Sequence, residues 1–124
     1  MKKMTLALLA TSLFATSALA QAADDLAAIK SAGVMKFGTE GTYAPYTYHD
    51  KSGKLVGFDV DVARAVAEKM GVKPEFVEGR WDGLIAGLSA KRYDAVINQV
   101  GITDERKAKF DFSQPYIGSK AVLV

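Results

Sequence analysis

The sequence predicts a single small α/β domain in which helices pack on a mostly parallel sheet. Short runs of β-branched and aromatic residues alternate along the chain with amphipathic helical patterns, at the spacing typical of α/β units. The chain has 124 residues and contains no internal repeat, low-complexity tract or proline-rich linker that would divide it. It contains no cysteine, so we expect its stability to come from packing alone.

The first 20 residues have the pattern of a cleavable secretory signal peptide. Lys2 and Lys3 precede an apolar stretch that ends at Ala18-Leu19-Ala20, an A-x-A cleavage site. The stretch is short, and no later segment reaches the roughly 20 apolar residues that a membrane helix needs. We therefore expect residues 21–124 to be exported as a soluble domain. An uncleaved N-terminal anchor is the alternative.

The charge of residues 21–124 is balanced. The whole chain carries 16 basic and 14 acidic residues, but two of the lysines and none of the acids stand in the predicted signal peptide. The remaining chain is therefore formally neutral, and its lysines are scattered. Neither nucleic acid nor an anionic membrane is expected as a partner.

The first part of the domain is expected to form a helix, a strand and a hairpin. Residues 24–31 predict a helix with acids in its first turn and Lys30 in its last, and Gly33 is expected to end it. A strand is predicted over residues 34–38. Residues 46–48 and 55–57 then flank the turn Asp50-Lys-Ser-Gly53, which predicts a β-hairpin.

The clearest helical pattern covers residues 59–70. Asp59 is expected to cap its start and Gly71 to end it. The apolar residues recur at every fourth position, which predicts one stripe buried in the core. This stripe consists of Val62, Val66 and Met70, with Ala63 beside them.

The second half of the domain continues the alternation. A strand is predicted over residues 74–77, followed by a helix that Asp82 caps and that runs to residue 90. Residues 94–97 predict a short apolar strand buried in the sheet. A further strand is expected over residues 121–124.

The polar stretch from residue 102 to residue 113 contains the most informative side chain. Arg106 is predicted to lie in the first turn of a short helix beside a loop, where its guanidinium fork can match the two oxygens of a carboxylate. A helix start adds free backbone N–H groups and a favourable dipole. The alternative is a solvated surface helix, because Asp104, Glu105 and Lys107 form a mixed charge run with Arg106.

Four motifs follow one another along the chain: Glu40-Gly-Thr-Tyr-Ala-Pro-Tyr46, Gly57-Phe-Asp-Val-Asp61, Trp81-Asp-Gly-Leu84 and the Arg106 stretch. Their order resembles the periplasmic polar amino-acid-binding proteins of ABC importers, solute-binding protein family 3. The Trp81 segment and Ile97-Asn-Gln-Val100 look most like the cystine-binding members. The resemblance begins after residue 25 and stops where the family's first lobe crosses to its second. It implies that residues 21–124 form an incomplete first lobe of the type II periplasmic-binding-protein-like fold.

The resemblance implies that Arg106 forms a bidentate salt bridge with the α-carboxylate of the ligand. The loop from Gln99 to Gly101 follows a predicted strand, at the place where open α/β sheets bind ligands. Family members use this loop's backbone carbonyl for the ligand amino group and its N–H for the carboxylate. Relatives often carry Thr or Ser where this chain has Gly101, so a hydroxyl donor is missing. Gly101 keeps its N–H, permits an unusual turn, or does both.

Two aromatic residues and one acid complete the implied site. Tyr43 and Trp81 match family positions whose rings sandwich the aliphatic or disulfide-bearing part of the ligand, a role suited to large, rigid surfaces. Packing in the core or on the surface is the alternative for each ring. Glu40 matches a position that is often acidic, where it either contacts an amino or amide group of the ligand or orders its own loop.

The sequence contains no motif that would hold a cofactor or a metal ion. A glycine-rich phosphate loop, a nucleophile elbow and an H-E-x-x-H pattern are all missing. His49 is the single histidine, and we expect it to be exposed beside its turn. One histidine with scattered carboxylates does not give the ligand spacing of a metal site.

These observations favour a non-enzymatic periplasmic binding component of an ABC importer. It would capture a polar amino acid, with cystine as the first candidate, close by a hinge and deliver the ligand to an inner-membrane permease. The full-length protein is expected to be a monomer. The alternatives are a periplasmic dehydratase of the same fold, a sensory module, and a non-functional or weakly binding gene fragment. Weak binding is expected at best, because a half-site does not desolvate the ion pair.

Overall fold

The computed structural model of the protein describes residues 24–123, so the predicted signal peptide lies outside the described residues. Helices and strands alternate along the chain, as predicted. They are α1 (Asp24–Ala32), β1 (Val34–Thr39), β2 (Thr42–Tyr43), β3 (Thr47–His49), β4 (Leu55–Val56), α2 (Phe58–Met70), β5 (Lys73–Glu78), α3 (Trp81–Ser89), β6 (Ala95–Val96) and α4 (Asp104–Lys107). None of the helices described here is long and apolar enough to cross a membrane.

A three-stranded parallel sheet forms the centre of the structure, with the strand order β5-β1-β6. β1 pairs with β5 along its whole length, from Val34 opposite Lys73 to Thr39 opposite Glu78. β6 pairs with the other side of β1, with Ala95 opposite Phe37. Because all three strands run in the same direction, their carboxyl ends meet at one edge of the sheet.

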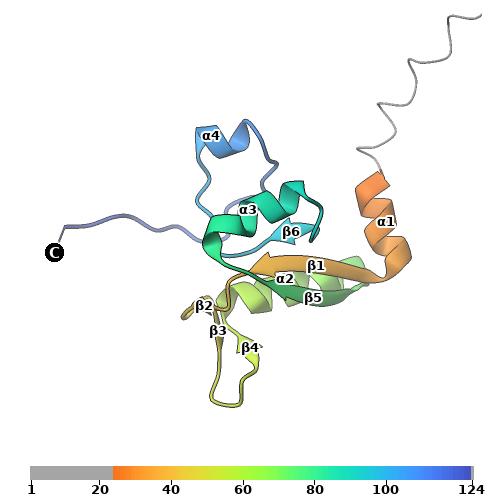
Figure 1. Cartoon of the computed structure of the whole chain (residues 1–124), viewed down its shortest axis with the longest axis horizontal. Helices are drawn as coiled ribbons and strands as arrows, with labels where there is room; N and C mark the ends of the chain where they lie inside the picture. The colour runs from red at the N-terminus through yellow and green to blue at the C-terminus, as the bar shows by residue number, and fades with distance from the viewer. Residues whose placement is uncertain (1–23, 124) are drawn as a thin grey trace, which may run out of the picture.

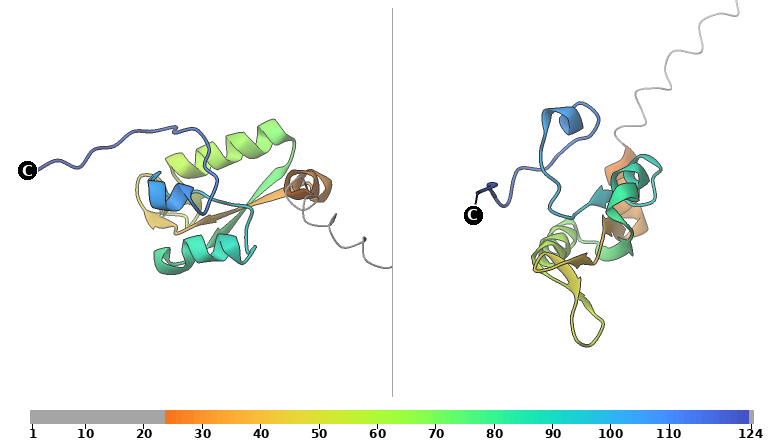
Figure 2. Two further views of the ribbon diagram at one scale, coloured as in Figure 1. Left: turned by 90° about the horizontal axis from the view of Figure 1, so that it is seen from above. Right: turned by 60° about the vertical axis from the view of Figure 1, so that its left-hand side comes forward.

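Helices cover both faces of this sheet. α2 lies on one face and α3 on the other, and α1 lies at the end where β1 begins (Figures 1 and 2). α4 and the segment after it lie at the side where the strands end (Figure 1). Gly33 and Gly71 end α1 and α2 in the left-handed conformation, with φ of 71° and 72°, as predicted from the sequence.

β2, β3 and β4 form a second, antiparallel sheet that projects from the main sheet (Figure 1). The predicted turn joins β3 to β4, and the Gly53 N–H donates to the Asp50 carbonyl oxygen at 2.9 Å. The Asp50 side chain stabilises the same turn, because its Oδ1 accepts from the Ser52 N–H at 2.8 Å. The hairpin prediction is confirmed.

The hydrophobic core lies between α2 and the parallel sheet. Its buried residues come from α2, from β1 and from the segments beside β5 and β6, and they are Phe37, Ala63, Ala67, Val72 and Ile97. Ile97 lies one residue beyond β6, so the buried apolar run predicted at residues 94–97 is regular strand only at Ala95 and Val96. The buried end of this run still anchors the following loop to the core.

The predicted buried stripe of α2 was wrong in part. Ala63 is fully buried, but Val62 and Met70 are only half-buried and Val66 is 40% exposed. α2 is rotated so that Val60 and the small residues Ala63 and Ala67 are its buried apolar residues. Alanine lets a helix approach close to a sheet, so Val62 and Val66 lie to the side of the contact.

Two predictions for the second half of the chain were also wrong. Arg80 occupies the N-cap position of α3 without a side-chain cap bond, and Asp82 lies inside the first turn instead. There its charge still suits the positive end of the helix dipole. Residues 121–123 form no strand, because no described strand pairs with them. Val124 lies outside the described residues.

Candidate functional site

The loops at the carboxyl ends of the parallel strands hold most of the predicted site residues. Glu40 directly follows β1, Trp81 follows β5 after two residues, and Gln99 and Gly101 follow β6. α4 carries Arg106 on the same side of the sheet (Figure 1). Open α/β sheets bind their ligands at this edge. The topology therefore gathers residues that are up to 66 positions apart in the sequence.

Three predicted site residues meet around the Arg106 guanidinium. Its Nη1 donates to the Gly101 carbonyl oxygen at 3.0 Å, and its Cζ lies 5.6 Å from the centroid of the Trp81 ring. That distance is within the range of a cation–π contact. The start of α4 is fixed by Thr103, whose Oγ1 accepts from the Arg106 N–H at 3.2 Å. A guanidinium has five N–H donors, so most of them remain for a ligand.

The left-handed backbone of the loop after β6 falls on Gln99 and not on Gly101. Gln99 has a φ of 54°, whereas Gly101 does not have a positive φ. A Cβ placed on Gly101 would lie 3.5 Å from Arg106 Nη1, which is an ordinary van der Waals distance. The suggestion that Gly101 permits an unusual turn was therefore wrong. A residue with a hydroxyl group would fit at this position.

Asp59 holds the loop after β6 from the start of α2. Its side chain is 0% exposed, and its Oδ2 accepts from the Gln99 N–H at 2.8 Å while its Oδ1 accepts from Gln99 Nε2 at 2.7 Å. The predicted capping role of Asp59 was wrong, because Gly57 occupies the N-cap position of α2. Since Asp59 engages the Gln99 N–H, that donor is not free for a ligand carboxylate.

Tyr116, in the segment after α4, donates from its hydroxyl to the same Asp59 Oδ1 at 3.0 Å. Its ring packs against Phe58, with the ring centroids 6.0 Å apart. Burial raises the pKa of the Tyr116 hydroxyl, and the Asp59 carboxylate raises it further. Burial also raises the pKa of Tyr93, whose hydroxyl donates to the Leu84 carbonyl oxygen.

We predict that the protein loses stability as the pH rises above about 10, the ordinary pKa of tyrosine. The unfolded chain releases these two protons first, so the folded state binds more protons and the free energy of unfolding falls with rising pH. Tyr116→Phe should reduce the slope of this fall and leave the part that comes from Tyr93. Urea unfolding between about pH 8 and pH 11 measures both slopes, and equal slopes would contradict the role of Tyr116.

Asn98 connects the ends of β1 and β6. Its side chain is buried, with Oδ1 accepting from the Glu40 N–H at 2.9 Å and from Thr39 Oγ1 at 3.1 Å. Its Nδ2 donates to Glu40 Oε2 at 2.7 Å, which fixes the Glu40 carboxylate at the edge of the sheet. Sequence reasoning assigned no role to Asn98. The sequence feature that could have indicated this role is the pair of amide residues, Asn98 and Gln99, directly after the buried apolar run that ends at Ile97.

An open pocket of about 500 Å³ lies beside Trp81. Its lining consists of Glu40, Thr42, Glu78, Gly79, Arg80, Trp81 and Asp82. Two predicted site residues, Glu40 and Trp81, therefore share one pocket. Tyr43 does not line it, is 46% exposed and packs against Tyr46 with the ring centroids 5.2 Å apart. The structure does not place Tyr43 in the same pocket as Trp81.

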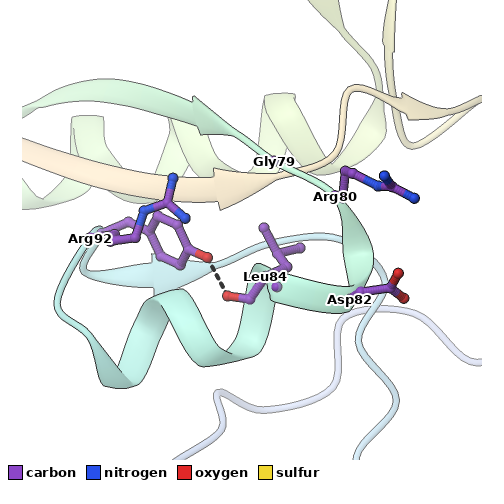
Figure 3. Close-up of a pocket in the computed structure, with 7 residues that line it drawn as sticks. Gly79, Arg80, Asp82, Leu84 and Arg92 are labelled. Atoms are coloured by element: carbon purple, nitrogen blue, oxygen red, sulfur yellow. Dashed lines mark hydrogen bonds between the residues drawn. The ribbon is translucent and has the colours of Figure 1, made fainter.

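A second pocket of about 440 Å³ adjoins the first on the α3 side (Figure 3). Arg80 and Asp82 line both pockets, and in Figure 3 they lie at the opposite end from Arg92. The dashed line in the figure is the hydrogen bond from the Tyr93 hydroxyl to the Leu84 carbonyl oxygen. None of the predicted site residues lines this second pocket.

His49 is the last residue of β3, next to the hairpin turn, and its side chain is 41% exposed, as expected. Its Nε2 lies 3.2 Å from Glu78 Oε1, and its Nδ1 lies 3.2 Å from the Gly41 carbonyl oxygen. Between residues 24 and 123, no group of three or more His, Cys, Asp or Glu side chains is arranged to hold a metal ion.

Comparison with known proteins agrees with this architecture. L-cystine-binding protein TcyA of Bacillus subtilis is 54% identical over 99 residues, which cover 79% of this chain and 37% of that protein. The L-cystine solute receptor of Neisseria gonorrhoeae, in its unliganded open conformation, matches 73% of this chain with 61% identity and a TM-score of 0.69. The arginine-bound form of domain 1 from TmArgBP matches 72% of this chain and 71% of that domain, with 40% identity and a TM-score of 0.70.

The chain spans about half or less of the length of the curated relatives that it matches. The predicted fold class is confirmed, because the solved neighbours are amino-acid-binding proteins of the type II periplasmic class and this chain is an α/β part of that fold. A family model matches residues 35–124. The chain belongs to the bacterial extracellular solute-binding proteins, family 3.

Proposed function

We propose that this chain belongs to the substrate-binding component of an ABC importer for a polar amino acid, with cystine as the first ligand to test. The observation that carries the proposal is the position of Arg106, whose guanidinium contacts the Gly101 carbonyl and the Trp81 ring at the carboxyl edge of the sheet. The names of the cystine-binding relatives support cystine as the ligand.

Each group at this edge has a separate role in the proposal. The free donors of Arg106 bind the α-carboxylate of the amino acid, because a guanidinium fork matches two carboxylate oxygens. The N–H groups of Val100 and Gly101 supplement it, since the Gln99 N–H is already bonded to Asp59. The Trp81 ring contacts the disulfide, and sulfur packs favourably against aromatic rings.

The proposed partner is the permease in the inner membrane, and the proposed compartment is the periplasm. In the full-length protein a second lobe would close on the bound amino acid, exclude water and strengthen the Arg106 ion pair. The predicted signal peptide at residues 1–20 would direct export. A monomer is the expected state of the full-length protein.

A binding role is favoured over catalysis. A dehydratase needs a positioned general acid or base. The acid proposed for that role from the sequence, Glu40, is bonded to Asn98 through Oε2 and through its own N–H. Both bonds fix Glu40 at the edge of the sheet, where its carboxylate can accept from an ammonium group of a ligand.

Binding by the isolated chain is expected to be weak and measurable. The arginine-bound domain 1 from TmArgBP is a related single domain that holds its ligand without the rest of its protein. A single lobe leaves the ion pair in contact with water, and exposed ion pairs contribute only about 1 kcal/mol or less. We therefore expect affinity in the high micromolar to millimolar range, about 4–6 kcal/mol of binding free energy.

Thermal unfolding of residues 21–124 in the presence of millimolar L-cystine, L-arginine, L-glutamine or L-glutamate tests the proposal. A ligand that binds only the folded state raises the midpoint, and about 1 kcal/mol of added stability raises it by about 4–8 °C in a domain of this size. Arg106→Ala should abolish the rise, and Arg106→Lys should retain only part of it because lysine lacks the planar fork.

Arg92→Ala is the matched control, because Arg92 lines the second pocket and not the Trp81 pocket. It should respond to the ligand as the unmodified chain does. A cooperative transition that none of the amino acids shifts, or a shift that survives Arg106→Ala, would overturn the proposal.

A further inference from the structure

The pocket beside Trp81 contains charges of both signs that the binding of an α-carboxylate by Arg106 does not use. Glu40 and Glu78 border it from the carboxyl ends of β1 and β5, and Arg80 and Asp82 border it from the start of α3. A pocket with this charge distribution matches a chemical group that carries an ammonium and a carboxylate together.

The two carboxylates are held in position by the protein. Asn98 Nδ2 donates to Glu40 Oε2 at 2.7 Å, and His49 Nε2 lies 3.2 Å from Glu78 Oε1. In each case the bond is to one of the two carboxylate oxygens, and a carboxylate has acceptor capacity at both. Acceptors that are already ordered lose less entropy when a ligand binds.

Arg80 is the cationic side of the pocket. It stands at the N-cap position of α3, is exposed, and forms no salt bridge with any residue between positions 24 and 123. Its side chain extends away from Leu84 and Arg92 of the neighbouring pocket (Figure 3). An unpaired guanidinium that borders a pocket is available to bind an anionic group.

Trp81 connects this pocket with Arg106. The indole ring lines the pocket and also contacts the Arg106 guanidinium, with 5.6 Å between Cζ and the ring centroid. In a disulfide-linked pair of amino acids, the two Cα atoms are about 4.4–6.8 Å apart. Because the ring touches both sites, a ligand whose first carboxylate is bound by Arg106 and whose disulfide packs on Trp81 is directed toward the pocket with its second amino-acid group.

The geometry points to Glu78 and Arg80 as specificity-determining residues for a ligand with an amino-acid group at each end. Glu78, together with Glu40, binds the ammonium of the second amino-acid group, and Arg80 binds its carboxylate. This inference rests on the proposed function, because it requires that Arg106 binds the first amino-acid group. According to this inference, the chain selects cystine-like ligands because they carry a second amino-acid group that Glu78 and Arg80 can bind.

Ligands that lack the second group provide the comparison. S-methyl-L-cysteine has the first amino-acid group and the sulfur but carries nothing into the pocket. L-cystathionine carries both groups through a thioether and is not affected by disulfide exchange. Because the pocket is open to water, each added ion pair should contribute only about threefold to fivefold in affinity.

Titration calorimetry of the purified chain with these two ligands tests the inference. Glu78→Gln and Arg80→Gln should each weaken cystathionine binding about threefold to fivefold and leave S-methylcysteine binding unchanged. Glu75→Gln, on the same strand as Glu78, and Arg92→Gln, on the second pocket, are the matched controls. Neither control should change the ratio of the two affinities.

The two proposals fail in different ways. If both ligands bind in an Arg106-dependent manner and neither Glu78→Gln nor Arg80→Gln changes the ratio of their affinities, the inference is overturned and the proposed function stands. The inference is also overturned if Glu78→Gln and Arg80→Gln change the ratio of the two affinities no more than Glu75→Gln and Arg92→Gln do. If neither ligand binds, the inference is overturned, and the thermal-unfolding test with the four amino acids decides the proposed function separately. If both ligands bind and their binding does not depend on Arg106, both proposals are overturned.

Discussion

Replacing Asp59 with alanine is expected to lower the free energy of unfolding by about 3 kcal/mol. The buried carboxylate accepts three hydrogen bonds, from the Gln99 N–H, from Gln99 Nε2 and from the Tyr116 hydroxyl. Alanine leaves these donors without their partner beside the fully buried position 59, and an unsatisfied buried group costs about 1–3 kcal/mol. The loop after β6 would also lose its attachment to α2, so we expect amino-acid binding to weaken as well.

Chemical denaturation of the unmodified chain and of Asp59→Ala measures this loss in the free energy of unfolding. Asp61→Ala is the matched control, because Asp61 lies in the same first turn of α2 and is exposed. Its favourable interaction with the helix dipole is worth at most about 1 kcal/mol. The loss of stability for Asp59→Asn should lie between those for Asp59→Ala and Asp61→Ala, since an amide retains one acceptor oxygen. Equal losses for Asp59→Ala and Asp61→Ala would show that the three hydrogen bonds contribute little.

The role of Asp59 was predicted wrongly because it depends on a contact between distant segments of the chain. An acid before an apolar-periodic segment is a local signal for a helix cap, and the sequence around Asp59 contains it. The backbone of residues 45 and 46 competes with this role, because the Pro45 carbonyl accepts from the Phe58 N–H at 3.1 Å and the Tyr46 carbonyl from the Asp59 N–H at 2.9 Å. A contact between segments more than ten residues apart leaves no periodic signal in the sequence.

Features that depend on local chemistry were predicted well. The glycines that end α1 and α2, the turn from Asp50 to Gly53 and the alternation of strands and helices all follow from neighbouring residues. The parallel sheet follows from that alternation, because parallel strands need helical crossovers. Once the strands are parallel, Glu40, Trp81 and Gln99 must come to one edge.

Features that depend on how two helices are placed were not predicted. The contact between Arg106 and Trp81 requires α4 to lie over the start of α3, and no pattern within either segment indicates that placement. The burial of Ala67 in place of Val66 was not predicted either, because the distance between α2 and the sheet decides which residues fit. Packing distances are properties of the pair of elements and not of one sequence segment.

The buried polar groups explain how the edge of the sheet is kept rigid. Asn98 joins β1 to β6 through Thr39 and Glu40, and Asp59 joins α2 to the next residue, Gln99. Every described side-chain N or O atom that is fully buried has a hydrogen-bond partner. Satisfied polar networks fix one arrangement of the groups that they connect. The loop that leads from β6 to Arg106 therefore starts from a fixed residue, Gln99.

Gly57→Ala is expected to lower the free energy of unfolding by about 3 kcal/mol, an effect as large as that of Asp59→Ala. Gly57 has a φ of 127° and a ψ of 173°, a combination that glycine alone adopts readily. A Cβ at this position would lie 2.3 Å from the Tyr46 carbonyl oxygen and 2.5 Å from its carbon. Both contacts are with backbone, so no side-chain rotation relieves them.

The close approach at Gly57 is what allows the chain at Pro45 and Tyr46 to accept from the first N–H groups of α2. We therefore expect Gly57→Ala to shift the Asp59 side chain as well. The loop after β6, which Asp59 holds through Gln99, would then become less ordered, and amino-acid binding would weaken. Gly53→Ala is the control, because Gly53 has a φ of 82° with no atom near its Cβ position and should cost only about 1 kcal/mol. If thermal unfolding gives the two variants the same midpoint, left-handed backbone strain alone accounts for the loss, and the packing of residues 45 and 46 against α2 does not hold Asp59 in place.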